Sequence, residues 1–128
     1  MTTKEVADLL VSLMREGKYA EIYQTLYAEN AKSIEPENQW GMPTLVEGLQ
    51  NFPAKGAEFN AQFGEFYSFY VGEAIVAGEH AAIAMGYEAE HKTKGRIKMD
   101  EIAVYHIHEG KVLSEQFFYG VFTASLLP

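Results

Sequence analysis

The stretch from Arg96 to Phe122 limits the possible folds more than any other part of the chain. It contains two runs rich in β-branched and aromatic residues, separated by Glu109-Gly110. This pattern predicts a β-hairpin with a two-residue turn. Such a turn places Asp100 opposite Tyr119, on the same face of the hairpin. The other members of this face are then Ile102, Val104, His106, Leu113, Glu115 and Phe117.

Three titratable residues interrupt this otherwise apolar face. They are Asp100, His106 and Glu115. A buried carboxylate is costly unless it is paired or protonated, so carboxyl groups on an apolar sheet face are candidates for a functional site. The choice of Asp100 depends on the register, because a single β-bulge reverses the faces and places Glu101 inside instead.

The composition narrows the class of protein. A chain of 128 residues with 48% hydrophobic residues predicts one folded domain, over residues 1–128. The formal net charge of −8 argues against nucleic acid or an anionic membrane as a partner. The absence of cysteine excludes disulfides, thiolate zinc sites and thiol nucleophiles. No apolar run reaches the length of a signal peptide or a membrane span, so we expect a cytoplasmic location.

The first third of the chain has helical periodicity. A capping box at Thr2 and Glu5 begins a helix that ends at Gly17, and a second short helix follows from Tyr19 to near Asn30.

A strand over residues 31–35 ends at Pro36, and a loop with Trp40 follows. Thr44 and Glu47 form a second capping box, which predicts a third helix that Pro53 breaks. Residues 54–64 show no assignable pattern.

From Glu65 onward the pattern predicts a four-stranded antiparallel meander. Turns at Gly78-Glu79 and Lys94-Gly95 separate its first three runs. With a two-residue turn at Lys94-Gly95, the face that carries Asp100 continues through Ile83, Met85, Tyr87 and Tyr70.

We expect the helices to cover the face that carries Asp100. The other face is also partly apolar, so we expect a homodimer to cover it. The order of elements predicts an α+β fold: a cone-shaped half-barrel of a strongly curved antiparallel sheet wrapped around the N-terminal helices, with a pocket at its open end.

The chain resembles the nuclear transport factor 2 superfamily, in particular its SnoaL-like and ketosteroid isomerase-like branches. The resemblance is carried by the order of elements, by AENAKSIEP at residues 28–36, and by GKV and FFY at residues 110–112 and 117–119. It implies a general base at Glu35, before Pro36, and an oxyanion-stabilising acid at Asp100. It also matches Tyr119 to an aromatic residue of the last strand. The oxyanion tyrosine of ketosteroid isomerases falls near Leu10, where this chain has no tyrosine within a turn.

Proton abstraction next to a carbonyl group needs a carboxylate base and a second acid kept neutral by burial. We assign these roles to Glu35 and Asp100, with Tyr119, Tyr87 or Tyr70 as substitute hydroxyl donors. The expected pocket-lining residues are Trp40, Tyr70, Tyr87, Ile102, Val104, His106, Glu115, Phe117 and Tyr119.

Several roles stay open at this point. Trp40 is either a lid over the pocket or a core residue, and Glu115 pairs with His106 in either a structural or a catalytic role. His106 and His108 share a face but lack an evident third ligand, so we expect no metal site and no cofactor.

The leading hypothesis is an isomerase-, cyclase- or hydratase-type enzyme that acts on a hydrophobic carbonyl or hydroxyl compound. The alternative is a non-catalytic small-molecule-binding or dimerisation module on the same scaffold.

Overall fold

A computed structural model describes residues 1–120 and 123–124. Its helices are α1 (Thr3–Arg15), α2 (Tyr19–Leu26) and α3 (Phe52–Asn60), with a 3₁₀ turn, η1, at Leu49–Asn51. The capping box is confirmed, because Thr2 accepts a hydrogen bond from the backbone of Glu5 and the Glu5 carboxylate accepts one from the backbone of Thr2. None of the helices in this part of the chain is long and apolar enough to cross a membrane. The cytoplasmic location stays a prediction.

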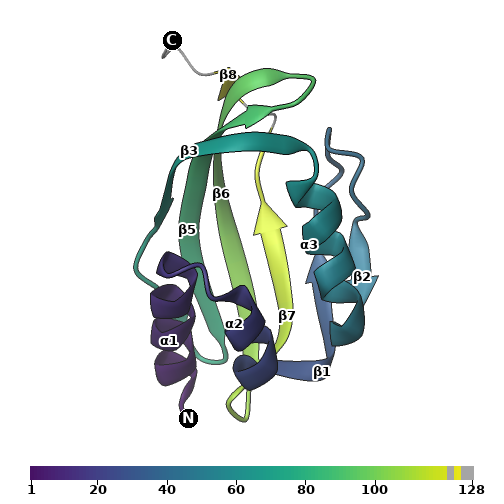
Figure 1. The fold of residues 1–128 in the computed structure, drawn as a ribbon. Coiled ribbons are helices and arrows are strands. Elements are labelled where there is room, and N and C mark those ends of the chain that lie inside the picture. The colour runs from purple at the N-terminus through teal and green to yellow at the C-terminus, as the bar shows by residue number, and fades with distance from the viewer. Residues whose placement is uncertain (121–122, 125–128) are drawn as a thin grey trace.

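The strands form one curled, unclosed sheet with the helices on its concave side (Figure 1). Their order is β2-β1-β7-β6-β5-β3; in addition, β4 pairs with β5 and β8 pairs with β6. All pairs are antiparallel except the parallel pair β1 and β7. The bounds are β1 (Tyr27–Ile34), β2 (Leu45–Glu47), β3 (Phe63–Val71), β4 (Ile75–Ala77), β5 (His80–His91), β6 (Gly95–His108), β7 (Lys111–Phe118) and β8 (Thr123–Ala124).

This architecture confirms the predicted α+β half-barrel, an open cone wrapped around helices. Figure 1 shows α1 and α2 at one end of the cone and α3 beside β2. The predicted hairpin stretch extends to Phe122, and its last two residues lie outside the described part of the chain.

The prediction of a helix after Thr44 that Pro53 breaks is wrong. Leu45–Glu47 is strand β2, and the helix begins at Phe52 with Pro53 in its first turn. Proline lacks an N–H group, but the first turn of a helix has no intrahelical acceptor for that group. Pro53 therefore starts the helix instead of ending it.

The turn at Glu109-Gly110 is confirmed, but the pairing beyond it shifts by one residue. His108 pairs with Lys111, as a two-residue turn requires, and both turn residues have positive φ angles of 48° and 79°. Leu113 is then an extra residue on β7, so that His106 pairs with Ser114 and Tyr105 with Glu115. This β-bulge reverses which residues of β6 share a face with Glu115.

The turn between β5 and β6 also differs from the prediction. His91 pairs with Gly95, so the turn comprises residues 92–94, and Ala89 pairs with Ile97 instead of Asp100. Three is an odd number of residues, and side chains alternate along a strand. The shift therefore again reverses the faces of β6 relative to β5. The bulge at Leu113 and the longer turn at residues 92–94 thus have the same effect on β6. They place Asp100 on the convex face and Glu101 on the concave face.

Two hydrophobic clusters occupy the concave side. The helical core joins α1 and α2 to Ile83, Ala103, Tyr105, Ile107 and Val112. The aromatic core lies at the other end of the sheet and contains Trp40, Met42, Phe63, Ala89, Ile97 and Met99, with Phe59, Tyr87 and Tyr119 packed against it. Trp40 is 7% exposed and contacts the rings of Phe59, Phe63 and His91. Trp40 is thus a core residue in this structure.

Candidate acid–base site

A layer of polar side chains separates the two cores. Along β6, Met99 belongs to the aromatic core and Ala103 to the helical core, and Glu101 lies between them on the same face. Neighbouring elements add side chains to this layer. We call it the polar layer, and it consists of Tyr27, Ser33, Glu35, Lys55, Glu101 and Glu115.

Glu35 and Lys55 form the ion pair of this layer. Lys55 Nζ lies 3.1 Å from Glu35 Oε1, and the two side chains are 13% and 14% exposed. The ammonium group also lies 5.1 Å from the centroid of the Phe117 ring. The other carboxylate oxygen of Glu35, Oε2, is buried and has no hydrogen-bond partner among the described residues. The Glu35 carboxyl group thus has one oxygen beside an ammonium group and one oxygen without a partner in the described part of the chain.

Ser33 lies on the concave side of β1, and Glu35, the residue directly after the strand, keeps the same alternation. The backbone N–H of Glu35 donates to Thr44 at 2.9 Å, and Pro36 then ends the pairing because it has no N–H group. Lys55 reaches the same place from the first turn of α3. Segments that are distant in the sequence thus bring the pair together.

Glu115 is the most buried carboxylate of the polar layer, with 6% exposure. It accepts hydrogen bonds from the hydroxyls of Tyr27 and Ser33, the second at 2.6 Å. Ser33 in turn accepts a hydrogen bond from Lys55 at 2.6 Å. Burial raises the pKa of Glu115, whereas the two hydroxyls and the charge of Lys55 oppose that rise. The ammonium group of Lys55 therefore interacts with two carboxyl groups, with Glu35 directly and with Glu115 through Ser33.

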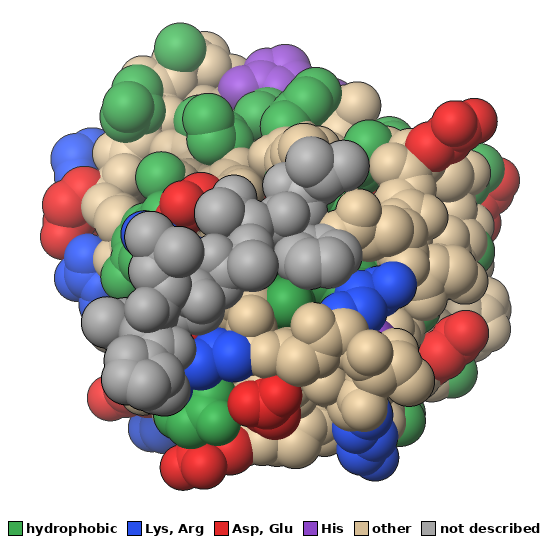
Figure 2. Space-filling model, turned by 90° about the horizontal axis from the view of Figure 1, so that it is seen from above, with side chains coloured by type: hydrophobic (Ala, Val, Ile, Leu, Met, Phe, Trp, Pro, Cys, Tyr) green, Lys and Arg blue, Asp and Glu red, His purple; other side chains and the backbone are tan. Residues whose placement is uncertain are grey.

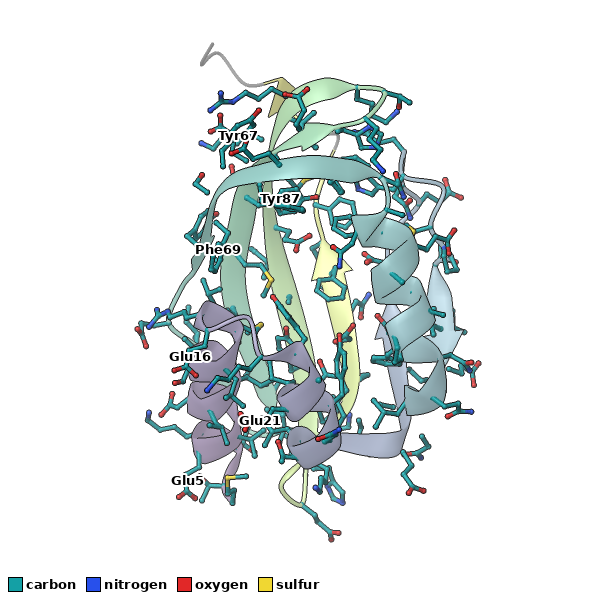
Figure 3. The ribbon with its side chains drawn as sticks, viewed as in Figure 1. Glu5, Glu16, Glu21, Tyr67, Phe69 and Tyr87 are labelled. Carbon is teal, nitrogen blue, oxygen red and sulfur yellow. The ribbon has the colours of Figure 1, made fainter. Side chains whose placement is uncertain are left out.

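Glu101 has the protonation behaviour of an acid that works near neutral pH. Burial, with a contribution from the negative charge of Glu35, raises the pKa of Glu101 to about 7, and Lys55 opposes the rise. Two phenols face the same carboxylates. Burial and the charges of Glu35 and Glu101 raise the pKa of Tyr119, which also hydrogen-bonds to Glu35, and burial and the same charges raise the pKa of Tyr87. Figure 3 shows Tyr87 below β3, directed into the interior.

The raised pKa of Glu101 makes stability depend on pH. The folded state binds the proton of the Glu101 carboxyl group more tightly than the unfolded state does. The stabilisation from this proton is therefore fully present below pH 4.5 and is lost as the pH rises through about 7. Replacement of Glu101 by Gln should flatten this decline, which amounts to about 3 kcal/mol at most. Urea unfolding of both proteins between these pH values measures it. Parallel curves would show that Glu101 titrates normally.

The structure brings together only part of the predicted site. Glu35, Tyr87, Glu115, Phe117 and Tyr119 lie on the concave side. The predicted inward direction of Asp100, Ile102, Val104 and His106 is wrong, because the two register shifts place them on the convex side. The predicted inward direction of Tyr70 is also wrong, because Tyr70 pairs with Gly86, whose partner on β6 is Asp100.

Asp100 forms its contacts on the convex side. Tyr70 donates a hydrogen bond to Asp100 Oδ1 at 2.8 Å. Gly86 between them allows this contact, since a Cβ atom there would lie 2.6 Å from the Tyr70 ring. His106 pairs with Glu79 at 3.1 Å, not with Glu115. Within the described residues, no group of three His, Asp or Glu side chains could hold a metal ion.

Sequence reasoning missed Tyr27, Ser33 and Lys55. The helical spacing predicts a helix at Tyr27, and Lys55 lies in the segment without an assignable pattern. The alternation of β1 would have shown that Ser33 and Glu35 share a face. Glu101 was identified only as the result of a bulge.

The fold and the polar layer define a cone of the nuclear transport factor 2-like class, with an acid–base cluster on its concave side. A family model for the SnoaL-like domain matches residues 1–119, and the chain therefore belongs to that family. No curated protein matches the chain.

Solved structures agree with this assignment. A candidate SnoaL-like polyketide cyclase from Mesorhizobium loti has 25% identity and a TM-score of 0.84, covering 93% of this chain and 100% of that chain. A protein of unknown function from Burkholderia pseudomallei, with the nuclear transport factor 2-like fold, has 11% identity, a TM-score of 0.76 and coverages of 94% and 92%. A candidate isomerase from Bacillus subtilis has 16% identity, a TM-score of 0.72 and coverages of 94% and 90%. The last two similarities concern the fold alone.

Proposed function

We propose that the polar layer is the active site of an isomerase-, cyclase- or hydratase-type enzyme that acts by acid–base chemistry on an apolar carbonyl compound. The observation that carries this proposal is the pair of unlike carboxyl groups. Glu35 lies beside an ammonium group, whereas burial raises the pKa of Glu101 to about 7. A carboxyl group beside a positive charge and a nearby carboxyl group with a raised pKa are suited to act as base and acid.

In this proposal Glu35 removes a proton from the carbon next to the carbonyl group. Its Oε2 atom, which has no hydrogen-bond partner among residues 1–120 and 123–124, accepts that proton. Glu101 in its protonated form donates a hydrogen bond to the enolate oxygen, and Lys55 adds positive charge where negative charge develops. The hydroxyls of Tyr119 and Tyr87 replace the missing tyrosine of the first helix. Asp100 has no part in the mechanism.

Partly accessible apolar side chains next to the polar layer support binding of a hydrophobic molecule. Met85 and Phe117 pack at the edge of the helical core, and Tyr87 and Tyr119 at the edge of the aromatic core. Tyr119 also lines an open hollow of about 420 Å³ with residues 37–39 and Gly120. The hollow thus lies beside Tyr119, the phenol that hydrogen-bonds to Glu35.

Carboxyl titration by ¹³C NMR tests the acid–base pair without a substrate. One glutamate signal should titrate near pH 7, because burial raises the pKa of Glu101 to about 7. That signal should vanish in Glu101→Gln and remain in Glu58→Gln, a matched change at an exposed position of α3. Titration of Glu101 near the usual value of about 4.3 would contradict the proposed role.

One observation favours a binding module instead of an enzyme. Lys55 already pairs with Glu35 and Ser33, so the layer is largely satisfied without a ligand. If the protein is a binding module, apolar ketones should bind equally well to the parent protein and to the Glu35→Gln variant, without chemical change. If the protein is an enzyme, it should convert a substrate, and the rate should depend on Glu35.

The convex face supports the predicted homodimer, which we also propose. An outer apolar patch runs across neighbouring strands and consists of Ile75, Ala82, Ala84, Ile102, Val104 and Phe118. Figure 2 shows hydrophobic side chains gathered along one edge of the molecule, next to histidine. The chain carries a net charge of −8, but the patch itself contains no carboxylate, so its apolar side chains can pack against those of a second copy.

Substitution of Ile102 by Glu should dissociate this dimer, because it buries one carboxylate from each copy opposite an apolar surface. Analytical ultracentrifugation should show a dimer for the parent protein and a monomer for Ile102→Glu. Gln50→Glu, at an exposed position away from the patch, serves as the control. A monomeric parent protein would contradict the proposed dimer.

A further inference from the structure

Lys55 differs from every other lysine of this chain. Of the eight lysines, all lie within the described residues, and the other seven are exposed. The Lys55 side chain is only 13% exposed and lies at the boundary between carboxylates and aromatic rings. A lysine in such a place can react as a nucleophile as well as act as a charge.

The neighbours of Lys55 match the needs of imine formation. An ammonium group must first lose a proton, and Glu35 Oε1 lies 3.1 Å from Nζ to accept it. The oxygen that leaves the carbonyl compound must gain protons, and Glu101 is the acid of the same layer. Ser33 Oγ, 2.6 Å from Nζ, fixes the direction of the amine, and the ring of Phe117 provides an apolar surface beside it.

Lys55 lies near the N-terminal end of α3. It lies in the first turn of the helix, and the first turn has no acidic residue of its own. The helix dipole opposes a positive charge at this end. Glu35, from another element, is therefore the group that balances the charge and can also take the proton.

We propose that Lys55 forms an imine with aldehydes or ketones that carry an apolar body. The Lys55 ammonium group transfers one proton to Glu35, and its lone pair then forms a bond to the carbonyl carbon. The electrons of the C=O bond move to oxygen, which takes a proton from Glu101. The nitrogen loses a second proton to the ionised Glu101, the hydroxyl group takes the proton held by Glu35 and leaves as water, and the C=N bond forms, so that both carboxyl groups return to their starting states. In sum, ammonium and carbonyl give iminium and water, without an oxidant or a reductant.

The inference rests on the proposed function, because it assigns the same site to the same class of carbonyl compound. It adds a covalent step. An iminium nitrogen withdraws electrons more strongly than a carbonyl oxygen, so the neighbouring C–H becomes more acidic, and Glu35 stands beside it as the base. Lys55 would thus activate the substrate that Glu35 deprotonates.

Reductive trapping tests the imine directly. The full chain is incubated at neutral pH with 2-naphthaldehyde, which has no hydrogen on the carbon next to its carbonyl group, and with sodium cyanoborohydride, which reduces iminium ions to stable amines. Intact-mass spectrometry should show a single adduct, and peptide mapping should locate it at Lys55. Labelling should be at least about tenfold faster than at any exposed lysine, because Lys55 is held beside its proton acceptor.

Two variants provide the controls. Lys55→Arg keeps the positive charge but cannot form an imine, and it should abolish the fast adduct. Lys32→Arg, at an exposed position of the neighbouring strand β1, should leave it unchanged. Labelling spread over the exposed lysines, or a fast adduct that persists in Lys55→Arg, would overturn the imine proposal.

A second assay separates this proposal from the proposed function. 2-Tetralone has exchangeable hydrogens next to its carbonyl group, and NMR in D₂O follows their loss. Exchange that depends on Glu35, without an adduct at Lys55, would retain the acid–base function and overturn the imine. An adduct at Lys55 without exchange would retain the imine and contradict the acid–base function.

Discussion

Replacement of Glu35 by Gln should lower the rate of hydrogen exchange in 2-tetralone by about 10²- to 10⁴-fold, the usual contribution of a positioned general base. Glutamine keeps the shape of the side chain but cannot accept the proton. The reason for the large effect is the position of Glu35. Its Oε1 atom is held by Lys55, and its buried Oε2 atom has no partner within the described residues.

The measurement compares the exchange rate of the parent protein with those of Glu35→Gln and Glu58→Gln. Glu58 is an exposed residue of α3, so the control removes one carboxylate without a change in the polar layer. Circular dichroism establishes that both variants are folded. Equal exchange rates in all three proteins would show that Glu35 is not the base.

The second large effect concerns stability. Lys55→Met should lower the free energy of unfolding at pH 7 by about 3 kcal/mol, because removal of one partner of a mostly buried ion pair leaves an uncompensated charge. Two carboxylates depend on this ammonium group, since Glu35 pairs with it directly and Glu115 through Ser33. Methionine has a similar length, so the packing against Phe117 is largely kept.

The loss should shrink as the pH falls. Lys55 opposes the rise in the pKa of Glu101 and of Glu115, which means that it stabilises their ionised forms. Protonation at low pH removes those charges and with them the need for the ammonium group. Urea unfolding at pH 4 and pH 7 measures the difference. Lys32→Met, at an exposed position of β1, should change stability by less than about 0.5 kcal/mol.

A double-mutant cycle with Glu35→Gln identifies the cause. The combination of Lys55→Met and Glu35→Gln should be less destabilising than the sum of the single changes, because both charges of the pair are then absent. Strict additivity, together with equal losses at both pH values, would show that Lys55 contributes packing alone.

Local signals predicted the elements of this fold well. The capping box at Thr2 and Glu5 begins α1, and Glu109-Gly110 forms the turn before β7. These features depend on residues that are close in sequence. The rest of the chain does not change the backbone conformations that those residues prefer. The segment around Pro53 failed because proline is compatible with both the end and the first turn of a helix. Only the packing of this segment in the folded chain decides whether Pro53 ends a helix or begins one.

The candidate site was predicted in part for the same reason. Glu35 follows from the family resemblance, which implies a general base before the proline that ends the first strand. Lys55 could not be found, because its contacts with Glu35 and Ser33 join α3 to β1 across a stretch without a clear pattern. Contacts of this kind exist only after the chain has folded.

The N-terminal helices, the antiparallel hairpins and the α+β half-barrel were thus predictable from the amino-acid sequence through local propensity and hydrophobic patterning. The tertiary structure decided which of two adjacent acids, Asp100 or Glu101, faces the concave side. That choice depends on one extra residue at Leu113 and on the turn at residues 92–94. Side chains alternate along a strand, so each odd shift in register exchanges the two faces. The packing of β6 against the two cores therefore placed Glu101 inside.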